Sequence, residues 1–554
     1  MHPSNLAKRG TVLLFLAVIA FYFYGLGHFP LLGPDEPRYA QVAREMFLRH
    51  DLVTPTLGGH LWFEKPALLY WMMIGSFKLF GVTEWAARVP SALAGVLTIV
   101  AVFVVARQAT SSDEDDQSHK YVFWCSLVSA STLGIVVFSR AASFDIILTM
   151  TATWALAFYL LYEFALNEKR RRFCLAGFYA FIGLSLLAKG LIGIVIPFGV
   201  VAVYHLLERK LPQRSGLISL LWGLPLALIV AGVWYAPVIQ RNGWVFIDQF
   251  FIQHHFARYI SNKFHHRAAV YYYLLIVPLL ALPWTAFLID GLLLQTKRLL
   301  ARAPSSRSSR LNSLLLFSLA WILFPLVFFS LSSSKLPGYM LPAVPAAAFI
   351  VGERIWRLSL DSKNKAASRW TTTTAAIFCV LFAVATLVYA RRTGNLELTS
   401  ALLIAAPVLI AGGIALFRSV KTSVSIISIS AACAVASIMA LNFAAPAFAD
   451  RQSSKRLLQL ADARGYSKAP VYGLQRDERS PEFYAAGRVV YEPDGEPTMY
   501  EGVAQVVWES RRRQATILTM ARPKDVQQFR ELSSMRVDVV GDNGKVALVA
   551  VGPP

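Results

Sequence analysis

Two adjacent carboxylates stand directly after the first long apolar stretch of the chain. Asp35 and Glu36 lie between Pro34 and Pro37 in the segment GPDEPRYA, residues 33–40. The prolines hold this acidic pair at the start of a predicted helix. The carboxylates could cap that helix, or they could act as acid–base or electrostatic groups in catalysis.

A second charged pair lies among aromatic residues in the same loop. Glu64 and Lys65 occur in the segment WFEKP, residues 62–66. Aromatic side chains are typical of the lipid headgroup region, where a lysine can bind a phosphate. The alternative interpretation is an ordinary anchor at the membrane interface.

Charged and hydroxyl-bearing residues also lie at the ends of later apolar segments. Asp145 begins a long apolar helix, which it could cap, and Lys189 separates two apolar segments. In SKLPGY, residues 334–339, a proline and a glycine break the helix and leave Lys335 and Tyr339 able to point into a cavity. A pocket that combines acids, cations and aromatic residues suits a phosphorylated lipid substrate.

A long aromatic loop, residues 238–269, contains four of the ten histidines of the chain. His255 and His266 could bind a divalent metal together with a loop carboxylate, or they could only form hydrogen bonds. Arg258 and Arg267 are better suited to bind phosphate, because a guanidinium group matches the geometry of phosphate oxygens.

Apolar helices must position these groups. A helix needs about 20 mostly apolar residues to cross a bilayer, and the sequence predicts about thirteen such spans. They lie near residues 8–29, 85–108, 121–139, 141–166, 173–188, 190–208, 217–237, 270–293, 311–331, 338–353, 370–390, 400–417 and 422–446. The shorter segment 66–81 is amphiphilic and is expected at the membrane interface.

Lysines and arginines are concentrated in alternate short loops, which predicts the orientation. The basic loops lie within residues 169–172, 209–214, 297–310 and 354–369. By the positive-inside rule these loops and the N-terminus are cytoplasmic. The long loops near 30–84 and 238–269 then lie outside, together with the C-terminus and the candidate site.

The composition changes after Pro446, where the long apolar runs end. Short alternating or apolar runs predict strands at 471–473, 488–491, 515–520 and 545–551, and helical patterns occur near 452–464 and 523–533. The sequence therefore predicts a membrane domain over residues 1–446 and a small soluble α/β domain over residues 447–554.

The overall composition excludes several classes of protein. Of 554 residues, 56% are hydrophobic and only 16% are charged, with a formal net charge of +21. A soluble enzyme would carry more charge, a disordered chain would be less apolar, and a nucleic-acid binder would not carry so much apolar surface. We therefore expect a polytopic α-helical membrane protein that binds no nucleic acid.

The ordered motifs resemble those of the bacterial lipid A aminoarabinose transferases. This family has the type-C glycosyltransferase fold and is related to protein O-mannosyltransferases and oligosaccharyltransferases. The resemblance covers roughly residues 10–350, and beyond them it rests on the layout alone. The motifs that carry it are PDEPRYA (34–40), FEKP (63–66), the Asp145 loop, LAKG (187–190), HHFAR (254–258) and SKLPGY (334–339).

The resemblance implies transfer of 4-amino-4-deoxy-L-arabinose from undecaprenyl phosphate to a lipid A phosphate, with resistance to cationic peptides as the consequence. It places the reaction at the periplasmic face of the bacterial inner membrane. The implied partners are the undecaprenyl-phosphate amino sugar donor, the lipid A acceptor and membrane lipids, and the chain is expected to act as a monomer.

The resemblance also implies roles for the candidate residues. Asp35, Asp145 and Glu36 would be catalytic. Glu64, His255 and His266 would hold a divalent metal, zinc or magnesium. The residues that would bind the substrate and its phosphate are Lys65, Arg258, Arg267, Tyr339, Lys335, Lys189 and Arg38.

Two alternatives stay open at this point. A related transferase could move its sugar to another lipid or to a protein, and a hydroxyl acceptor would then need Asp35 as a base. A lipid transporter would carry ionisable residues within its helices, often in repeated halves. The candidate residues gather in external loops instead, and the sequence has no convincing internal repeat.

Overall fold

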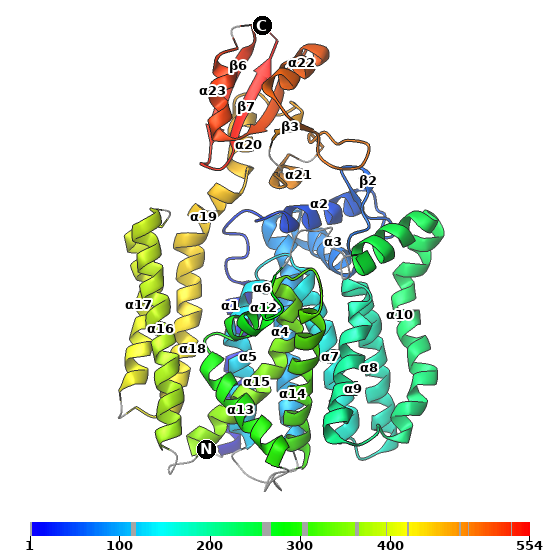
Figure 1. Ribbon diagram of the computed structural model, residues 1–554, viewed down its shortest axis with the longest axis vertical. Helices are drawn as coiled ribbons and strands as arrows, with labels where there is room; N and C mark the ends of the chain where they lie inside the picture. Colours follow the sequence, from blue (N-terminus) through cyan, green and yellow to red (C-terminus); the bar gives the residue numbers. More distant parts are fainter. Residues whose placement is uncertain are drawn as a thin grey trace. The chain divides into compact units, whose positions relative to one another are not determined.

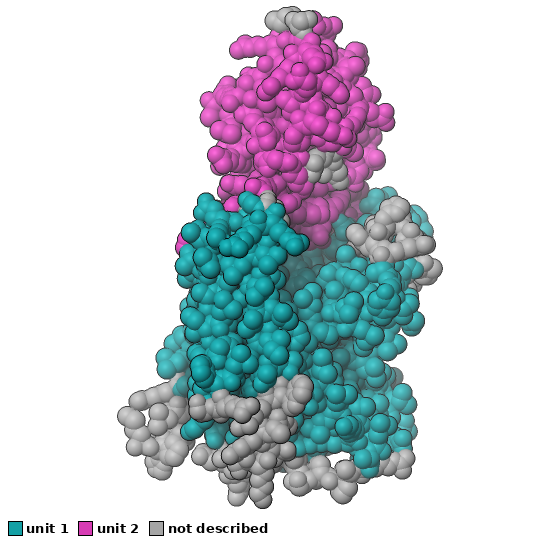
Figure 2. All heavy atoms as spheres, turned by 60° about the vertical axis from the view of Figure 1, so that its left-hand side comes forward, with its two compact units in different colours: residues 1–24, 64–69, 90–439 teal, residues 25–63, 70–89, 440–554 magenta. Residues whose placement is uncertain are grey.

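A computed structural model provides the structure of the chain (Figure 1). It describes residues 3–111, 118–257, 268–301, 309–360, 365–394, 396–417, 420–475, 478–485, 487–532 and 534–553. The chain divides into two compact units, which Figure 2 shows in different colours. Unit 1 comprises Met1–Tyr24, Glu64–Leu69 and Pro90–Met439, and unit 2 comprises Gly25–Phe63, Tyr70–Val89 and Ala440–Pro554. The predicted boundary after residue 446 lies within unit 2, because the C-terminal part of this unit begins at Ala440. Most of the first long loop also belongs to unit 2.

Unit 1 is built from helices throughout its described part. Long neighbouring helices pack side by side, α7 on α8, α8 on α10 and α9 on α14 (Figure 1). The elements are α1 (Pro3–Phe23), α4 (Glu84–Ala109, which begins in unit 2), α5 (Ser118–Ser131), α6 (Leu133–Phe138), α7 (Phe144–Phe164), α8 (Glu168–Lys189), α9 (Ile192–Glu208), α10 (Arg214–Phe246), η1 (Ile247–Ala257), α12 (Tyr272–Leu280), α13 (Thr285–Ala301), α14 (Ser309–Ser330), η2 (Pro337–Ala343), α15 (Val344–Leu360), α16 (Lys365–Thr393), α17 (Leu398–Leu416) and α18 (Thr422–Met439).

The helices of unit 1 are those of an integral membrane protein. Within the described residues, eight helices are long and apolar enough to cross a bilayer, or up to nine if the bent pair α12 and α13 forms one span. The outer face of α10 exposes large apolar side chains, among them Leu221, Leu228 and Val233. Such a surface would be costly in water and is suited to contact with lipid.

The expected number of about thirteen spans is not confirmed, because several predicted spans are broken or short. The predicted span 121–139 is interrupted at Thr132, between α5 and α6. The predicted span 270–293 bends by 116° between α12 and α13. The predicted span 338–353 begins with the short 3-10 helix η2 before α15 starts.

Unit 2 combines elements of the first long loop with a mixed α/β fold. The loop contributes α2 (Asp35–Leu48), β1 (Thr56–Leu57), β2 (His60–Leu61) and most of α3 (Leu68–Phe80). The C-terminal part contributes η3 (Ala440–Ala444), α19 (Ala445–Gln452), α20 (Lys455–Ala463), β3 (Val471–Leu474), α21 (Ser480–Tyr484), β4 (Met499–Tyr500), α22 (Val503–Arg513), β5 (Ile517–Ala521), η4 (Pro523–Asp525), α23 (Val526–Arg530), β6 (Arg536–Asp542) and β7 (Ala547–Gly552).

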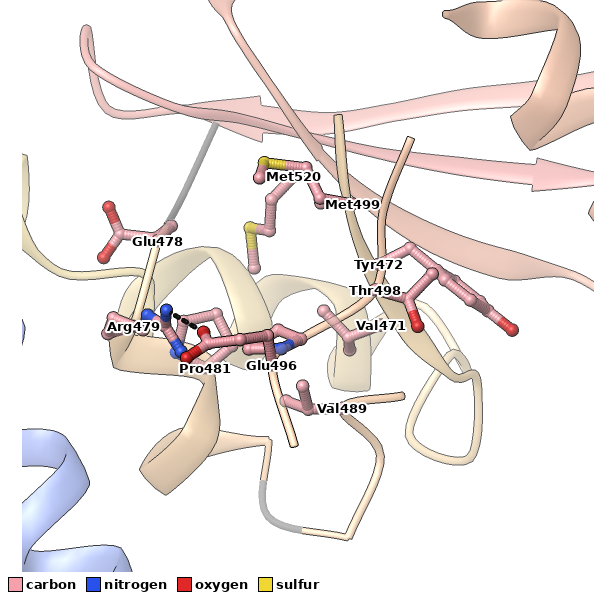
Figure 3. Close-up of a pocket in the computed structure, with 12 residues that line it drawn as sticks. Val471, Tyr472, Glu478, Arg479, Pro481, Val489, Glu496, Thr498, Met499 and Met520 are labelled. Carbon is pink, nitrogen blue, oxygen red and sulfur yellow. Dashed lines mark hydrogen bonds and ion pairs between the residues drawn. The ribbon is translucent and has the colours of Figure 1, made fainter. Parts of the chain in front are cut away.

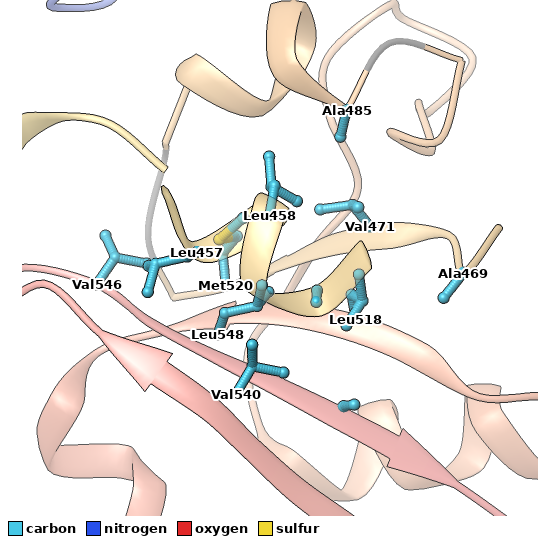
Figure 4. Packing of buried hydrophobic residues seen from close by; sticks show 12 residues of the cluster. Leu457, Leu458, Ala469, Val471, Ala485, Leu518, Met520, Val540, Val546 and Leu548 are labelled. Carbon is cyan, nitrogen blue, oxygen red and sulfur yellow. The ribbon is translucent and has the colours of Figure 1, made fainter. Parts of the chain in front are cut away.

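The C-terminal strands form one sheet in the order β4-β3-β5-β7-β6. β3 is parallel to β4 and β5, whereas β7 is antiparallel to β5 and β6. Alternate residues of β5 and β7 point to opposite faces of the sheet, so that Leu518 and Leu548 pack against α20 (Figure 4) while Ile517 and Val549 pack against α22 and α23. Apolar side chains on both faces of the central strands make this part a layered α/β domain, as the sequence predicts.

Candidate functional site

Three of the predicted site residues come together in unit 1. Asp145 is the second residue of α7, and its carboxylate forms an ion pair with the ammonium group of Lys189, the last residue of α8. The Lys189 ammonium also lies 4.8 Å from the centre of the Tyr339 ring. A cation between a carboxylate and an aromatic face is thus held at the meeting point of α7, α8 and η2. We call Asp145, Lys189 and Tyr339 the membrane-unit cluster.

Asp145 does not cap its helix, because another residue does. The Ser143 hydroxyl is the N-cap of α7 and accepts a hydrogen bond from the Asp145 backbone N–H, with 3.2 Å between Oγ and N. The Asp145 carboxylate is therefore left for Lys189. Capping was the alternative function for Asp145, and the position of Ser143 argues against it.

Gly338 lies directly against the Asp145 carboxylate. A Cβ atom at position 338 would lie 2.3 Å from Asp145 Oδ2 and 3.0 Å from a ring carbon of Phe138. The sequence motif SKLPGY therefore needs glycine at this place for a steric reason, since any larger residue would push the carboxylate away from Lys189.

We expect Gly338→Ala to lower the rate of the expected sugar transfer by about tenfold or more while the protein still folds. The added methyl group would displace the Asp145 carboxylate from its position beside Lys189. Gly413→Ala is the matched control, since a Cβ at position 413 of α17 would meet no atom within 4 Å. Turnover and thermal melting of the purified variants provide the measurement. Equal turnover in both variants would contradict the steric role of Gly338.

Lys335 is buried and is tied to its own loop. Its ammonium group donates a hydrogen bond to the carbonyl oxygen of Ser332. The next residue, Leu336, is held by Tyr273 of α12, whose hydroxyl lies 3.2 Å from both the N–H and the carbonyl oxygen of Leu336. The loop that precedes Tyr339 is thus fixed by hydrogen bonds to its backbone.

Glu64 and Lys65 also form an ion pair, with 2.6 Å between Lys65 Nζ and Glu64 Oε1. Both side chains are nearly buried. No group of three His, Cys, Asp or Glu residues that could hold a metal occurs in the part of the chain that the structure describes. Since the side chain of His255 and all of His266 lie outside the described residues, the metal site remains a prediction. Arg258 and Arg267 lie outside them as well.

Asp35 and Arg38 lie together in unit 2. Asp35 is the first residue of α2, and its side chain is 59% exposed. Its Oδ1 atom accepts a hydrogen bond from Arg38 Nη2 at 2.8 Å, while Arg38 Nε donates to the Pro34 carbonyl oxygen. The Arg38 guanidinium also lies 5.4 Å from the centre of the Trp62 ring. An exposed carboxylate thus stands beside an arginine at the start of the helix.

Glu36 is buried, unlike its neighbour, and binds an arginine that the sequence analysis did not single out. Both carboxylate oxygens of Glu36 accept hydrogen bonds from Arg88, at 3.0 and 2.8 Å. Arg88 is fully buried and also donates to the carbonyl oxygens of Leu26, Phe29 and Pro30. This contact indicates a structural function for Glu36. An arginine close to the start of the apolar segment 85–108, four residues after Glu84, was the signal that could have found Arg88.

Glu36→Gln should lower the free energy of unfolding by about 3–5 kcal/mol, because it leaves the buried Arg88 guanidinium without its counter-charge. Thermal or denaturant unfolding of the purified protein measures this loss. Glu168→Gln is the control, since the Glu168–Arg172 pair is exposed and should contribute little. Equal stability of the two variants would show that the Glu36–Arg88 pair does not hold the loop.

The C-terminal domain also contains a cavity of about 170 Å³ beside β3 (Figure 3). The charged side chains at this cavity bind other residues of the same domain. Arg479 forms ion pairs with Glu482 and Glu496. Glu478 accepts a hydrogen bond from the Ser480 hydroxyl. We therefore assign no ligand to this cavity.

Comparison with known proteins places these residues in a family context. The sequence profile of the dolichyl-phosphate-mannose-protein mannosyltransferase family matches residues 9–290. An undecaprenyl phosphate-alpha-4-amino-4-deoxy-L-arabinose arabinosyl transferase of Aeromonas hydrophila subsp. hydrophila is 28% identical over 496 residues, 86% of each chain. The protein of the same name from Pseudomonas aeruginosa is 28% identical over 63% of this chain and 60% of its own length.

The fold is also similar to that of a solved protein over nearly the whole chain. The crystal structure of ArnT from Cupriavidus metallidurans bound to undecaprenyl phosphate matches with a TM-score of 0.78 and 25% sequence identity, over 98% of both chains. These matches confirm the resemblance to aminoarabinose transferases and the predicted fold class. They extend the similarity to the C-terminal α/β domain, for which the sequence motifs gave no support.

Proposed function

The chain belongs to the dolichyl-phosphate-mannose-protein mannosyltransferase family, and we propose that it transfers 4-amino-4-deoxy-L-arabinose from undecaprenyl phosphate to a phosphate of lipid A. The names of its relatives support the donor and the sugar. The observation that carries the proposal within the molecule is the membrane-unit cluster, where the Lys189 cation is held by Asp145 and Tyr339. The cluster joins three motifs that lie far apart in the sequence.

The chemistry of a phosphate acceptor fits such a cluster. A lipid A phosphate is already ionised near neutral pH, so that it needs little help from a general base. Catalysis then consists mainly of positioning and of charge stabilisation. The bond between the anomeric carbon and the donor phosphate oxygen breaks, its electron pair leaves with undecaprenyl phosphate, and an acceptor phosphate oxygen bonds to the same carbon.

Each residue of the membrane-unit cluster, and Lys65 outside it, has a function in this reaction. Lys189 and Lys65 neutralise the charge of the leaving undecaprenyl phosphate, and the Tyr339 ring keeps the Lys189 ammonium in place. Asp145 stabilises the positive charge that develops on the sugar, or binds its ammonium group. Asp35 is a further candidate for stabilising the charge on the sugar. Arg258 and Arg267 are further candidates for binding the leaving phosphate. We derive no step from a metal, because Glu64, the candidate metal ligand whose side chain is described, forms an ion pair with Lys65.

The reaction is expected to be a single displacement that inverts the anomeric carbon. NMR of the product reports the anomeric configuration, and retention would contradict a single displacement. We further propose that the protein acts as a monomer in the bacterial inner membrane, with the N-terminus in the cytoplasm and the site and C-terminal domain in the periplasm. The basic loops support this orientation.

Mass spectrometry of lipid A tests the proposed function in cells. Lipid A from cells that express the chain should gain the mass of one aminopentose, whereas cells without the chain should show no gain. An unchanged lipid A, together with a new sugar on another lipid or on protein, would favour the alternative of a related transferase that acts on a different acceptor. Movement of lipid without release of undecaprenyl phosphate would favour the transporter and exclude the enzyme.

A further inference from the structure

The C-terminal domain contacts the first long loop within unit 2, at the segment that leads to Asp35. The Tyr484 hydroxyl of α21 accepts a hydrogen bond from the Leu31 backbone N–H at 2.7 Å. The same hydroxyl donates to Glu84 Oε1 at 3.1 Å. Glu84 in turn forms an ion pair with Lys455 of α20. One tyrosine thus joins the loop backbone to an ion pair that involves the C-terminal domain.

A second set of contacts holds α2 itself. Arg44 of α2 donates a hydrogen bond to the Phe483 carbonyl oxygen at 2.8 Å, and its guanidinium lies 4.6 Å from the centre of the Phe483 ring. The Tyr491 ring lies so close to Gly58 that a Cβ there would be 2.2 Å from a ring carbon. The helix, the hairpin after it and the segment before it therefore all contact the C-terminal domain.

The backbone of the segment before Asp35 is held by side chains that belong to three helices, α2, α4 and α21. Arg88 binds the carbonyl oxygens of Leu26, Phe29 and Pro30, and the Leu32 N–H donates to Glu36 at 2.8 Å. The Leu31 N–H lies between these anchors and is bound by Tyr484. Arg88 and Glu36 belong to the N-terminal part of the chain, whereas Tyr484 binds this segment from the C-terminal domain.

We propose that the C-terminal domain is a positioning element of the transferase, in which Tyr484 fixes the backbone that places Asp35. The proposal rests on the proposed function, because it concerns the rate of that reaction. Tyr484 is a positioning residue that acts through the Leu31 backbone. Losing its hydroxyl should affect turnover more than binding of the donor, because Lys65 and Lys189, which are proposed to neutralise the donor phosphate, lie on other segments of the chain.

The protonation state of Tyr484 agrees with this function. Burial, with the Glu84 carboxylate close by, raises the pKa of the Tyr484 hydroxyl well above its usual value. The hydroxyl therefore stays protonated at physiological pH, and it can accept from Leu31 and donate to Glu84 at the same time.

The test compares Tyr484→Phe with a matched control, Tyr466→Phe. Tyr466 belongs to the same domain, but its hydroxyl donates to Asp538 of β6 and not to the first loop. Both variants are purified at full length and assayed for kcat and KM with the undecaprenyl-phosphate sugar donor. Hydrogen exchange of peptides covering residues 26–34 is measured on the same samples by mass spectrometry.

We expect Tyr484→Phe to lower kcat by about tenfold, to leave KM for the donor within about twofold, and to increase exchange at Leu31. Tyr466→Phe should change none of these. Wild-type kcat in Tyr484→Phe, or unchanged exchange at Leu31, would overturn the proposal. If Tyr484→Phe does not fold, Arg44→Met tests the same surface, with the same expected fall in kcat and the same overturning result.

The two proposals fail in different ways. A wild-type protein that releases no undecaprenyl phosphate from the sugar donor would contradict the proposed function. An active wild type whose kcat is unaffected by Tyr484→Phe would contradict only the positioning role of the C-terminal domain.

Discussion

Replacing Asp145 by asparagine should lower the turnover of the purified protein by at least about 100-fold, while the variant still folds and is still inserted into the membrane when it is expressed. The change keeps the shape of the side chain but removes the charge that pairs with Lys189. In the proposed reaction this charge stabilises the positive charge on the sugar. Turnover is measured as the release of undecaprenyl phosphate from the sugar donor.

Asp290→Asn is the matched control for this prediction. Asp290 forms a comparable ion pair with Arg354, between α13 and α15, and belongs to none of the motifs. We expect its turnover to stay within about threefold of the wild type. Lys189→Met should be as inactive as Asp145→Asn, and the double variant should lose little more, because the two residues act as a unit. An Asp145→Asn variant no worse than Asp290→Asn would remove Asp145 from the site.

Asp35→Asn should also lower turnover by at least about 100-fold, and it should leave stability unchanged. The side chain is largely exposed, and in the described part of the chain it pairs with Arg38 in an ion pair that contributes little to folding. A large loss of activity would therefore report chemistry rather than unfolding. Turnover and thermal unfolding of the same sample give the two readings.

Two comparisons make the Asp35 prediction sharp. Asp462→Asn, which alters another exposed ion pair of unit 2, should keep both activity and stability. Glu36→Gln should lose stability first, because its carboxylate is buried against Arg88. Wild-type turnover in Asp35→Asn, or a melting temperature as low as that of Glu36→Gln, would contradict a catalytic function for Asp35.

The sequence motifs indicated candidate residues but not which of them lie in contact. Asp145 and Lys189 are 44 residues apart, and their motifs indicated a charged site but not an ion pair. Whether Asp145 caps α7 depended on Ser143, whose backbone conformation a sequence does not show. Glu36 stands beside Asp35 in the chain, yet burial separates their functions, because successive residues of a helix face different directions.

The association of the first loop with the C-terminal domain was beyond the reach of sequence patterns. Leu31 and Tyr484 are 453 residues apart, and neither lies in a motif that points to the other. Periodicity reports the face of a helix or strand that is buried, but not what covers it. The predicted domain boundary after residue 446 was placed where the composition changes, and composition does not show contacts between residues that are far apart in the chain.

The predicted fold succeeded where apolar patterns were continuous and failed where they were mixed with charged residues or broken. The strands predicted at 471–473, 515–520 and 545–551 correspond to β3, β5 and β7. The run 488–491 forms only isolated bridges, and β6 was missed, because its pattern RVDVVGD mixes charged and apolar residues on a half-exposed edge. In the same way, the breaks at Thr132 and between α12 and α13 divided predicted spans that hydropathy alone would join.

Purified protein supplied with undecaprenyl-phosphate aminoarabinose and two acceptors tests the central claim most directly. The acceptors are lipid A and lipid A from which the phosphates have been removed, and the products are analysed by mass spectrometry. We predict that lipid A gains one aminopentose with release of undecaprenyl phosphate, and that the dephosphorylated acceptor gains none. Equal transfer to both acceptors, or transfer to the dephosphorylated acceptor alone, would contradict the proposed phosphate acceptor.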